Sequence, residues 1–358
     1  MRFENALGES YNPISWLTFN DVLLKPHKSR FKSRNDKGIS LETNLFSDVL
    51  LKAPIISSNM DTVTGSSMAK EMCRLGGLGI LHRFHECYED YYGMIDDVYC
   101  DCDRVAFSIG CGDDWIRFSE RAISMIGEEN AIVCLDVAHG HMEQSIEMVE
   151  RLKQFGVSII AGNVATPEGA VELAAAGAKS IKVGIGCGSV CTTRIVTGHG
   201  VPQLSAIINA RRELDANGFE DVSIIADGGI RNSGDIVKSL AAGADAVMLG
   251  SMLAGCDETP GEIFTLANGS FKMYRGQSSR HFLKDIGKID VAAEGESIEV
   301  KAKGPVDAII TELLGGVRSG LTYSGAGSIK ELQEKAVFME ISHHGWVEST
   351  PHAITRVH

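Results

Sequence analysis

The sequence has no excess of basic residues, few prolines and no long apolar run. Its 358 residues include 34 Lys and Arg against 47 Asp and Glu, a formal net charge of −13, whereas sequence-independent binding of nucleic acid needs clustered basic side chains. No apolar stretch approaches the roughly 20 residues that span a membrane. Residues 1–16 lack the basic and apolar segments of a secretion signal. These absences predict a cytoplasmic protein that binds neither nucleic acid nor membrane.

The nine cysteines lack the paired spacing of a structural zinc site. Cys100 and Cys102 lie two residues apart and Cys187 and Cys191 lie four apart, with no matching second pair. We therefore expect reduced thiols. Glycine is abundant, with 39 residues against 8 prolines and no low-complexity tract. This balance indicates many tight junctions between strands and helices.

Short apolar runs alternate with helical patterns along the chain. Residues 175–184 and 241–250 align without gaps, and each holds a helix end, a glycine turn and a buried strand. Eight runs predict the strands of a (β/α)8 TIM barrel, with an open doubly wound sheet as the alternative: 53–61, 78–81, 105–109, 132–137, 158–161, 180–183, 223–226 and 246–249.

We interpret residues 1–358 as one catalytic domain with three additions to the barrel. These are an N-terminal arm at 1–50, a polar flap at 271–296 over the barrel mouth and a C-terminal tail at 341–358. A helix at 306–314 followed by a glycine turn at 315–320 is expected near the end. The tail carries four histidines, and a surface or a subunit contact is favoured there over a metal site: His343, His344, His352 and His358.

The glycine-rich stretch at 184–205 follows a predicted strand and carries the candidate nucleophile Cys191. In a barrel, the loops after strands seven and eight commonly bind phosphate. Here those loops, 227–231 and 250–252, each place glycine ahead of a helix, where backbone amides can approach an anion. The pattern favours a nucleoside monophosphate or another phosphorylated ligand over simple tight turns.

The motif Gly188-Ser-Val-Cys-Thr-Thr-Arg194 resembles the IMP dehydrogenase/GMP reductase family. Nearly the whole chain is similar, with the strongest likeness in six stretches: 17–26, 59–63, 184–203, 226–231, 250–252 and 315–319. The resemblance implies a purine nucleoside monophosphate at the barrel mouth, a cytoplasmic homotetramer and Cys191 as the residue that attacks purine C2.

The resemblance also implies roles for individual residues. Thr193 and Glu294 match the catalytic relay pair of the family's reductases, which would serve Cys191. Positions that match substrate binding are Met60, Ser189, Asp227, Gly228, Gly229, Gly250, Ser251, Tyr274, Gly276 and Gln277. Positions assigned to the cofactor are Asp136, His139 and Asn163. Gly186, Gly188 and Cys191 lie where family dehydrogenases bind a monovalent cation, K⁺, through loop carbonyls, and Arg280 and His281 stand where a flap base would lie.

Both family reactions remain open, and the balance of motifs favours GMP reductase with NADPH over IMP dehydrogenase with NAD. Only a short span separates Arg83 from Val105, so no regulatory domain is inserted there, and the flap is short. By contrast, Arg280-His-Phe282 and residues 345–349 are similar to dehydrogenases. Gln277 replaces a Met of both relatives, which extends the alternatives to a deoxy or modified purine nucleotide. A hypothesis from a different functional class is that the protein is not an enzyme but a regulator, a barrel that binds phosphate without turnover.

Overall fold

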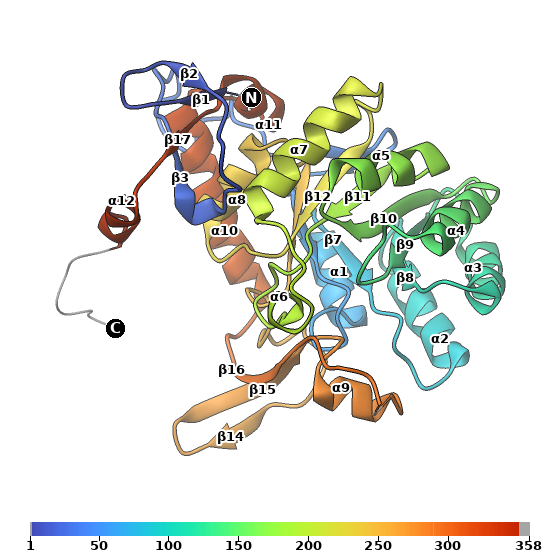
Figure 1. The fold of residues 1–358 in the computed structure, drawn as a ribbon. Helices are drawn as coiled ribbons and strands as arrows, with labels where there is room; N and C mark the ends of the chain where they lie inside the picture. Colours follow the sequence, from blue (N-terminus) through green and yellow to red (C-terminus); the bar gives the residue numbers. More distant parts are fainter. Residues whose placement is uncertain (1, 289, 351–358) are drawn as a thin grey trace.

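The computed structural model describes residues 2–288 and 290–350, and its centre is a closed barrel of parallel strands (Figure 1). Strand β13 pairs in parallel with β6, as Val247 opposite Ile55, and this pairing closes the ring. The TIM barrel predicted from the sequence is thus confirmed and the open sheet is excluded. The barrel strands are β6 (Ile55–Ser57), β7 (Leu78–Leu81), β8 (Val105–Ile109), β9 (Ala131–Asp136), β10 (Ser158–Val164), β11 (Ser180–Val183), β12 (Ser223–Asp227) and β13 (Ala246–Leu249).

Helices surround the barrel and cover it with amphipathic faces. In α3, for example, the buried residues Phe118, Ala122 and Ile126 recur every four positions and so form one stripe toward the strands. The covering helices are α1 (Ser66–Arg74), α2 (Tyr88–Tyr99), α3 (Asp113–Ile126), α4 (Glu143–Lys153), α5 (Pro167–Ala176), α7 (Gln203–Ala216), α8 (Ser233–Ala241) and α10 (Val306–Ser324). The span between β7 and β8 holds only α2 among its regular elements.

The amino-terminal end of the barrel is closed by a hairpin of β4 (Thr43–Phe46) and β5 (Val49–Leu51). Leu45 and Phe46 of this hairpin pack with inward-facing residues of the barrel, among them Ile56 and Ile160. Because this end is filled with apolar side chains, polar chemistry is confined to the opposite, carboxyl end of the strands.

The two ends of the chain meet in one sheet beside the barrel. It joins β1 (Arg2–Glu4), β2 (Ser10–Tyr11) and β3 (Val22–Leu24) of the arm to β17 (Val337–Glu340), near the short helices η1 (Phe19–Asp21), α11 (Ile329–Lys335) and α12 (His343–Glu348). His343 and His344 lie on α12, whereas His352 and His358 of the predicted tail fall outside the described residues. The described residues contain no cluster of three potential metal ligands, and none of their helices is long and apolar enough to cross a membrane.

The flap predicted at 271–296 forms part of a longer unit, 264–301, which is a three-stranded sheet with a helix and projects from the barrel on the side of the short helix α6 (Thr193–Val196) (Figure 1). It consists of β14 (Phe264–Leu266), β15 (Gly269–Arg275), α9 (Arg280–Asp285) and β16 (Ser297–Lys301). β15 pairs with β14 on one edge and with β16 on the other.

The predicted turn at 315–320 is wrong, because these residues continue α10 to Ser324. A Cβ on Gly316 would lie 2.2 Å from Ser233 Oγ, and one on Gly320 would lie 2.5 Å from a methyl group of Val237. The glycines therefore serve close packing of α10 against α8. Glycine-rich segments occur both in turns and in helices that pack closely, and the sequence does not distinguish the two. Here tertiary packing overrides the low helix propensity of glycine.

Candidate active site

The candidate nucleophile heads a chain of hydrogen bonds at the carboxyl end of β11. The Cys191 thiol donates to Thr193 Oγ1 at 3.1 Å, and Thr193 Oγ1 donates to Glu294 Oε2 at 2.9 Å. All three residues are half-buried. The structure thus brings together the three residues predicted as catalytic, although Glu294 is 101 positions from Thr193. A thiol joined through a hydroxyl to a carboxylate can lose its proton to that carboxylate or recover it.

Backbone pairing holds Glu294 beside the cysteine loop. Thr192 N donates to Glu294 O at 3.0 Å, and Glu296 N donates to Val190 O at 2.8 Å. The carboxylate is therefore placed by main-chain contacts between the flap and the loop. At the start of the loop, Gly184 has φ +155°, and a Cβ there would lie only 1.9 Å from the Asp227 carbonyl oxygen, so only glycine fits.

Five of the residues predicted to bind substrate converge from three loops and the flap. Ser189 Oγ lies 3.2 Å from Tyr274 Oη, and Tyr274 Oη contacts Met60 Sδ at 3.8 Å. Gly250 lies against the same hydroxyl, since a Cβ there would be 3.0 Å from it. Ser251 follows directly and is half-buried. Burial raises the pKa of Tyr274, so its hydroxyl is neutral and available to donate to an anion.

Asp227, at the end of β12, is held by an amide from β10, two strands away in the barrel. Asn163 Nδ2 donates to Asp227 Oδ2 at 2.8 Å and to Gly184 O at 2.9 Å. Burial raises the pKa of Asp227. Gly228 and Gly229 follow with φ of +92° and +80°, a conformation that favours glycine. The Cys187 thiol donates to Asp227 O at 3.2 Å and is thus part of the scaffold, and burial raises its pKa to about 12.

A buried lysine that sequence reasoning missed lies beneath this site. Lys182 Nζ is 2.7 Å from Asp136 Oδ1, and Arg83 Nε is 3.8 Å from Asp136 Oδ2. The Lys182 side chain is 1% exposed. Burial alone would raise the pKa of Asp136, but Lys182 and Arg83 bring it below its usual value. The signal was a lysine within an otherwise apolar strand, where an unpaired charge would be costly.

His82 lies at the end of β7, at the barrel mouth, and is uncharged. Burial, together with the charges of His85 and Arg275, lowers its pKa to about 3. Phe84 N donates to His82 Nδ1 at 3.2 Å, so the ring proton lies on Nε2. The His82 ring stacks on His85 at 4.4 Å. His82 can therefore donate one hydrogen bond but carries no charge near neutral pH.

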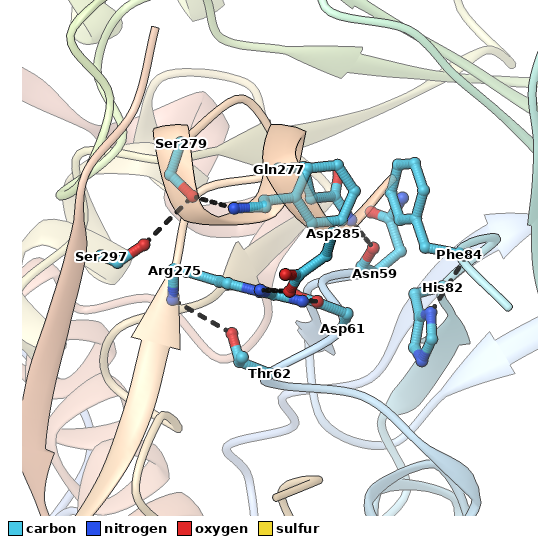
Figure 2. Close-up of polar contacts among 11 residues, drawn as sticks. Asn59, Asp61, Thr62, His82, Phe84, Arg275, Gln277, Ser279, Asp285 and Ser297 are labelled. Carbon is cyan, nitrogen blue, oxygen red and sulfur yellow. Dashed lines mark hydrogen bonds and ion pairs between the residues drawn. The ribbon is translucent and has the colours of Figure 1, made fainter. Parts of the chain in front are cut away.

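An arginine joins the flap to the rim of the barrel. Arg275 at the end of β15 donates from Nη2 to Asp61 Oδ2 at 2.6 Å and from Nη1 to Asp285 of α9 (Figure 2). Its backbone N–H contacts Thr62 Oγ1 at 3.3 Å, and its guanidinium lies over the Phe282 ring. These contacts fix the flap above the loop that follows β6.

Three of the predicted side chains lie outside this network. His139 is exposed on the loop after β9, with its ring 6.3 Å from that of His141. Arg280 and His281 are exposed on α9, and no hydrogen bond in the described part of the chain joins them to Cys191 or its relay.

The predicted cation ligands are backbone carbonyls of the cysteine loop. The Gly188 carbonyl oxygen, which has two lone pairs, accepts one hydrogen bond within the described residues, from Cys191 N at 3.2 Å. Gly186 lies on the adjoining part of the loop at φ +78°. The loop therefore keeps acceptor capacity for a cation.

Fold and site together define a TIM barrel whose mouth holds a thiol–hydroxyl–carboxylate chain and a corner of hydroxyl groups and glycines. The sequence profile of the IMP dehydrogenase / GMP reductase domain matches residues 16–352. The chain belongs to the IMP dehydrogenase/GMP reductase family, whose members are NAD(P)-dependent oxidoreductases acting on purine nucleoside monophosphates.

Similar proteins carry both family names. The chain is 39% identical to GMP reductase 2 of Homo sapiens, across 91% of this chain and 94% of that protein. It is 37% identical to inosine-5′-monophosphate dehydrogenase of Cryptosporidium parvum, across 94% and 95%. A crystal structure of a cysteine-to-alanine variant of GMP reductase from Trypanosoma brucei with guanosine 5′-monophosphate superimposes with a TM-score of 0.87 at 30% identity, across 96% and 99%. The identities are too close to separate the two reactions.

Proposed function

We propose that the protein is a GMP reductase that converts GMP to IMP with NADPH and releases ammonia. The observation that carries the proposal is the chain from the Cys191 thiol through Thr193 to the carboxylate of Glu294. It supplies a nucleophile together with a group that can hold a proton for a leaving amine. Likeness to GMP reductases, including one solved with GMP, supports the same reaction.

In the proposed mechanism the Cys191 thiolate attacks C2 of the purine, and the bond from C2 to the amino group breaks. Glu294, through Thr193, first takes the thiol proton and then returns it to the departing ammonia. Asp136, His139 and Asn163 would hold NADPH, which would supply the hydride for C2. Cleavage of the carbon–sulfur bond then frees IMP and restores the Cys191 thiolate. The hydride takes the place of the amino group that left with the thiol proton as ammonia, and a proton from solvent returns the Cys191 thiolate to the thiol for the next turnover.

The nucleotide is proposed to lie with its phosphate at the corner formed by Ser189, Tyr274 and Gly250 and the following Ser251. Hydroxyl groups and glycine backbone at this corner suit a phosphate. Asp227 is proposed to accept from a ribose hydroxyl, and the backbone of Gly228 and Gly229 after it to approach the nucleotide, with Gly229 at the phosphate. The Met60 sulfur, next to the Tyr274 hydroxyl, would then border the sugar and base.

Asp136 and Asn163 suit the cofactor side of the mouth, with exposed His139 at its edge. The Asp136 side chain is 13% exposed, so its carboxylate can still accept a hydrogen bond from a cofactor hydroxyl beside its ion pair with Lys182.

We propose that the loop carbonyls of Gly186, Gly188 and Cys191 can bind K⁺, and that the protein works as a single catalytic domain in a cytoplasmic homotetramer. Arg280 and His281 could act as a flap base only after a movement of α9 toward Cys191.

IMP dehydrogenase with NAD is the second candidate, favoured by the dehydrogenases among the relatives. The test monitors absorbance at 340 nm with GMP plus NADPH and, separately, with IMP plus NAD. We expect turnover in the first pairing. Turnover only in the second would refute the proposal, and tight nucleotide binding without turnover would favour a regulator.

A Cys191→Ala variant tests the covalent step. It should bind GMP but show no turnover, because no nucleophile remains to attack C2. Normal turnover by this variant would exclude covalent catalysis by Cys191.

A further inference from the structure

The side chain of Gln277 is fixed across the barrel mouth by one hydrogen bond. Its Nε2 donates to the backbone oxygen of Asn59, 218 positions away on the loop after β6, at 2.5 Å (Figure 2). A backbone oxygen can only accept, so this contact determines which end of the carboxamide is nitrogen. Gln277 is half-buried, and Asn59 is 3% exposed.

The backbone of Gln277 is separated from that of Cys191 by one paired segment, residues 294–296. Gly276 N donates to Glu296 O at 3.0 Å, and Glu294 N donates to Ser278 O at 2.9 Å. The other edge of the 294–296 segment pairs with the Cys191 loop. At a strand spacing of about 4.8 Å, the backbones of Gln277 and Cys191 are roughly 10 Å apart. The 294–296 segment separates the two backbones, so a base that meets both side chains would lie over that segment.

The carboxamide has unused hydrogen-bonding capacity. A primary amide carries two N–H groups, and the contact with Asn59 uses one of them. Within residues 2–288 and 290–350, no group donates to Gln277 Oε1. An amide anchored in this way still presents one oxygen and the neighbouring N–H side by side, the edge with which glutamine pairs to a base.

We propose that the Gln277 carboxamide reads the N1–H and O6 edge of a 6-oxopurine and so determines which nucleotide is accepted. Oε1 accepts from N1–H, which is bonded to the C2 atom that Cys191 attacks, and the free N–H donates to O6 on the side of Asn59. A 6-aminopurine presents the reverse order, a lone pair at N1 and a donor at C6. The amide cannot rotate to match it without losing its bond to Asn59. This specificity rests on the proposed function, since it places C2 at Cys191.

The test compares GMP with the 5′-monophosphate of 2,6-diaminopurine riboside, which has the same shape and the same 2-amino group. Dissociation constants are measured by isothermal titration calorimetry on the full chain and on Gln277→Met, which is similar in length but cannot form these hydrogen bonds. The unaltered protein should prefer GMP about 10- to 100-fold, the discrimination typical of one bidentate pairing. In Gln277→Met the preference should fall below about threefold, because no amide remains to distinguish the two edges.

Gln333→Met is the matched control, because Gln333 donates to Ala244 O from α11 and lies in neither the flap nor the cysteine loop. It should retain the full preference. An equal preference in Gln277→Met and the unaltered protein would overturn the proposal, as would equal binding of the two nucleotides by the unaltered protein. Turnover at 340 nm is measured separately: preference for GMP without its reduction refutes the proposed reaction but not the reading by Gln277.

Discussion

Replacing Lys182 with methionine removes the one ammonium group that lies within hydrogen-bond distance of Asp136 in the described part of the chain. The pair is separated by 2.7 Å, with the Lys182 side chain 1% and that of Asp136 13% exposed. Breaking a buried ion pair by removing one partner typically costs about 3–5 kcal/mol, because the other charge stays buried. Arg83 remains 3.8 Å from the carboxylate, so we expect the lower end of that range, about 3 kcal/mol of unfolding free energy.

Urea denaturation of the unaltered protein, Lys182→Met, Asp136→Asn and the double variant measures this cost. The double variant should be more stable than Lys182→Met alone, because it no longer buries an uncompensated carboxylate. A loss below about 1 kcal/mol in Lys182→Met, or costs that simply add in the double variant, would refute this account of the pair.

The same pair has a pH signature. In the unaltered protein Lys182 and Arg83 outweigh burial and lower the pKa of Asp136, so its contribution to stability is present above the unfolded pKa of about 3.9 and is lost as pH falls through the folded pKa. Without Lys182, burial dominates and raises that pKa. Lys182→Met should then lose stability as pH rises above about 4, so its deficit should be larger at pH 8 than at pH 5. A deficit that is constant between these pH values would contradict the argument.

Three further variants test the relay, the flap and the helix packing. Thr193→Val should lower kcat about 100-fold with little change in GMP affinity, because it removes the hydroxyl between thiol and carboxylate; unchanged kcat at 340 nm would exclude the relay. Arg275→Met should release the flap from the barrel rim and speed cleavage within 276–296 in limited proteolysis, and unchanged cleavage would contradict the fastening role. Gly320→Ala should lower the melting temperature through about 1–3 kcal/mol of overpacking on α8, whereas Gly315→Ala, with open space around it, should be neutral or stabilising.

The barrel could be predicted from the sequence because each of its strands is a short apolar run followed by polar residues, and a helix comes next after every strand but β13, which the flap follows. The same reasoning misjudged 315–320, where glycines allow close packing within α10 instead of ending it. The amino-acid composition is the same whether glycines end a helix or let it pack closely on a neighbour. Only the position of α8, in particular Val237, distinguishes them.

Contacts in the site could be predicted where the two residues are close in sequence, but not where they are far apart in sequence. Cys191 and Thr193 are two positions apart in a glycine-rich loop, so their contact follows from the motif. Arg275 and Asp61 are 214 positions apart, and no sequence pattern pairs two charges at that separation. Lys182 was passed over because its strand has the appearance of an apolar run, although alternation along a barrel strand would have pointed its side chain inward.

The two halves of the proposed chemistry come from different parts of the fold. The barrel supplies Cys191 on the loop after β11, whereas Glu294 and Gln277 come from the flap. Both flap residues are held by the same backbone pairing, in which the 294–296 segment lies between the cysteine loop and residues 276–278. A displacement of that segment would therefore move the proton acceptor and the proposed base-reading amide together. The Cys191 loop can be shared by a reductase and a dehydrogenase, but Glu294 and Gln277 are not part of that loop. The flap, which carries both side chains, should therefore determine the reaction and the accepted base.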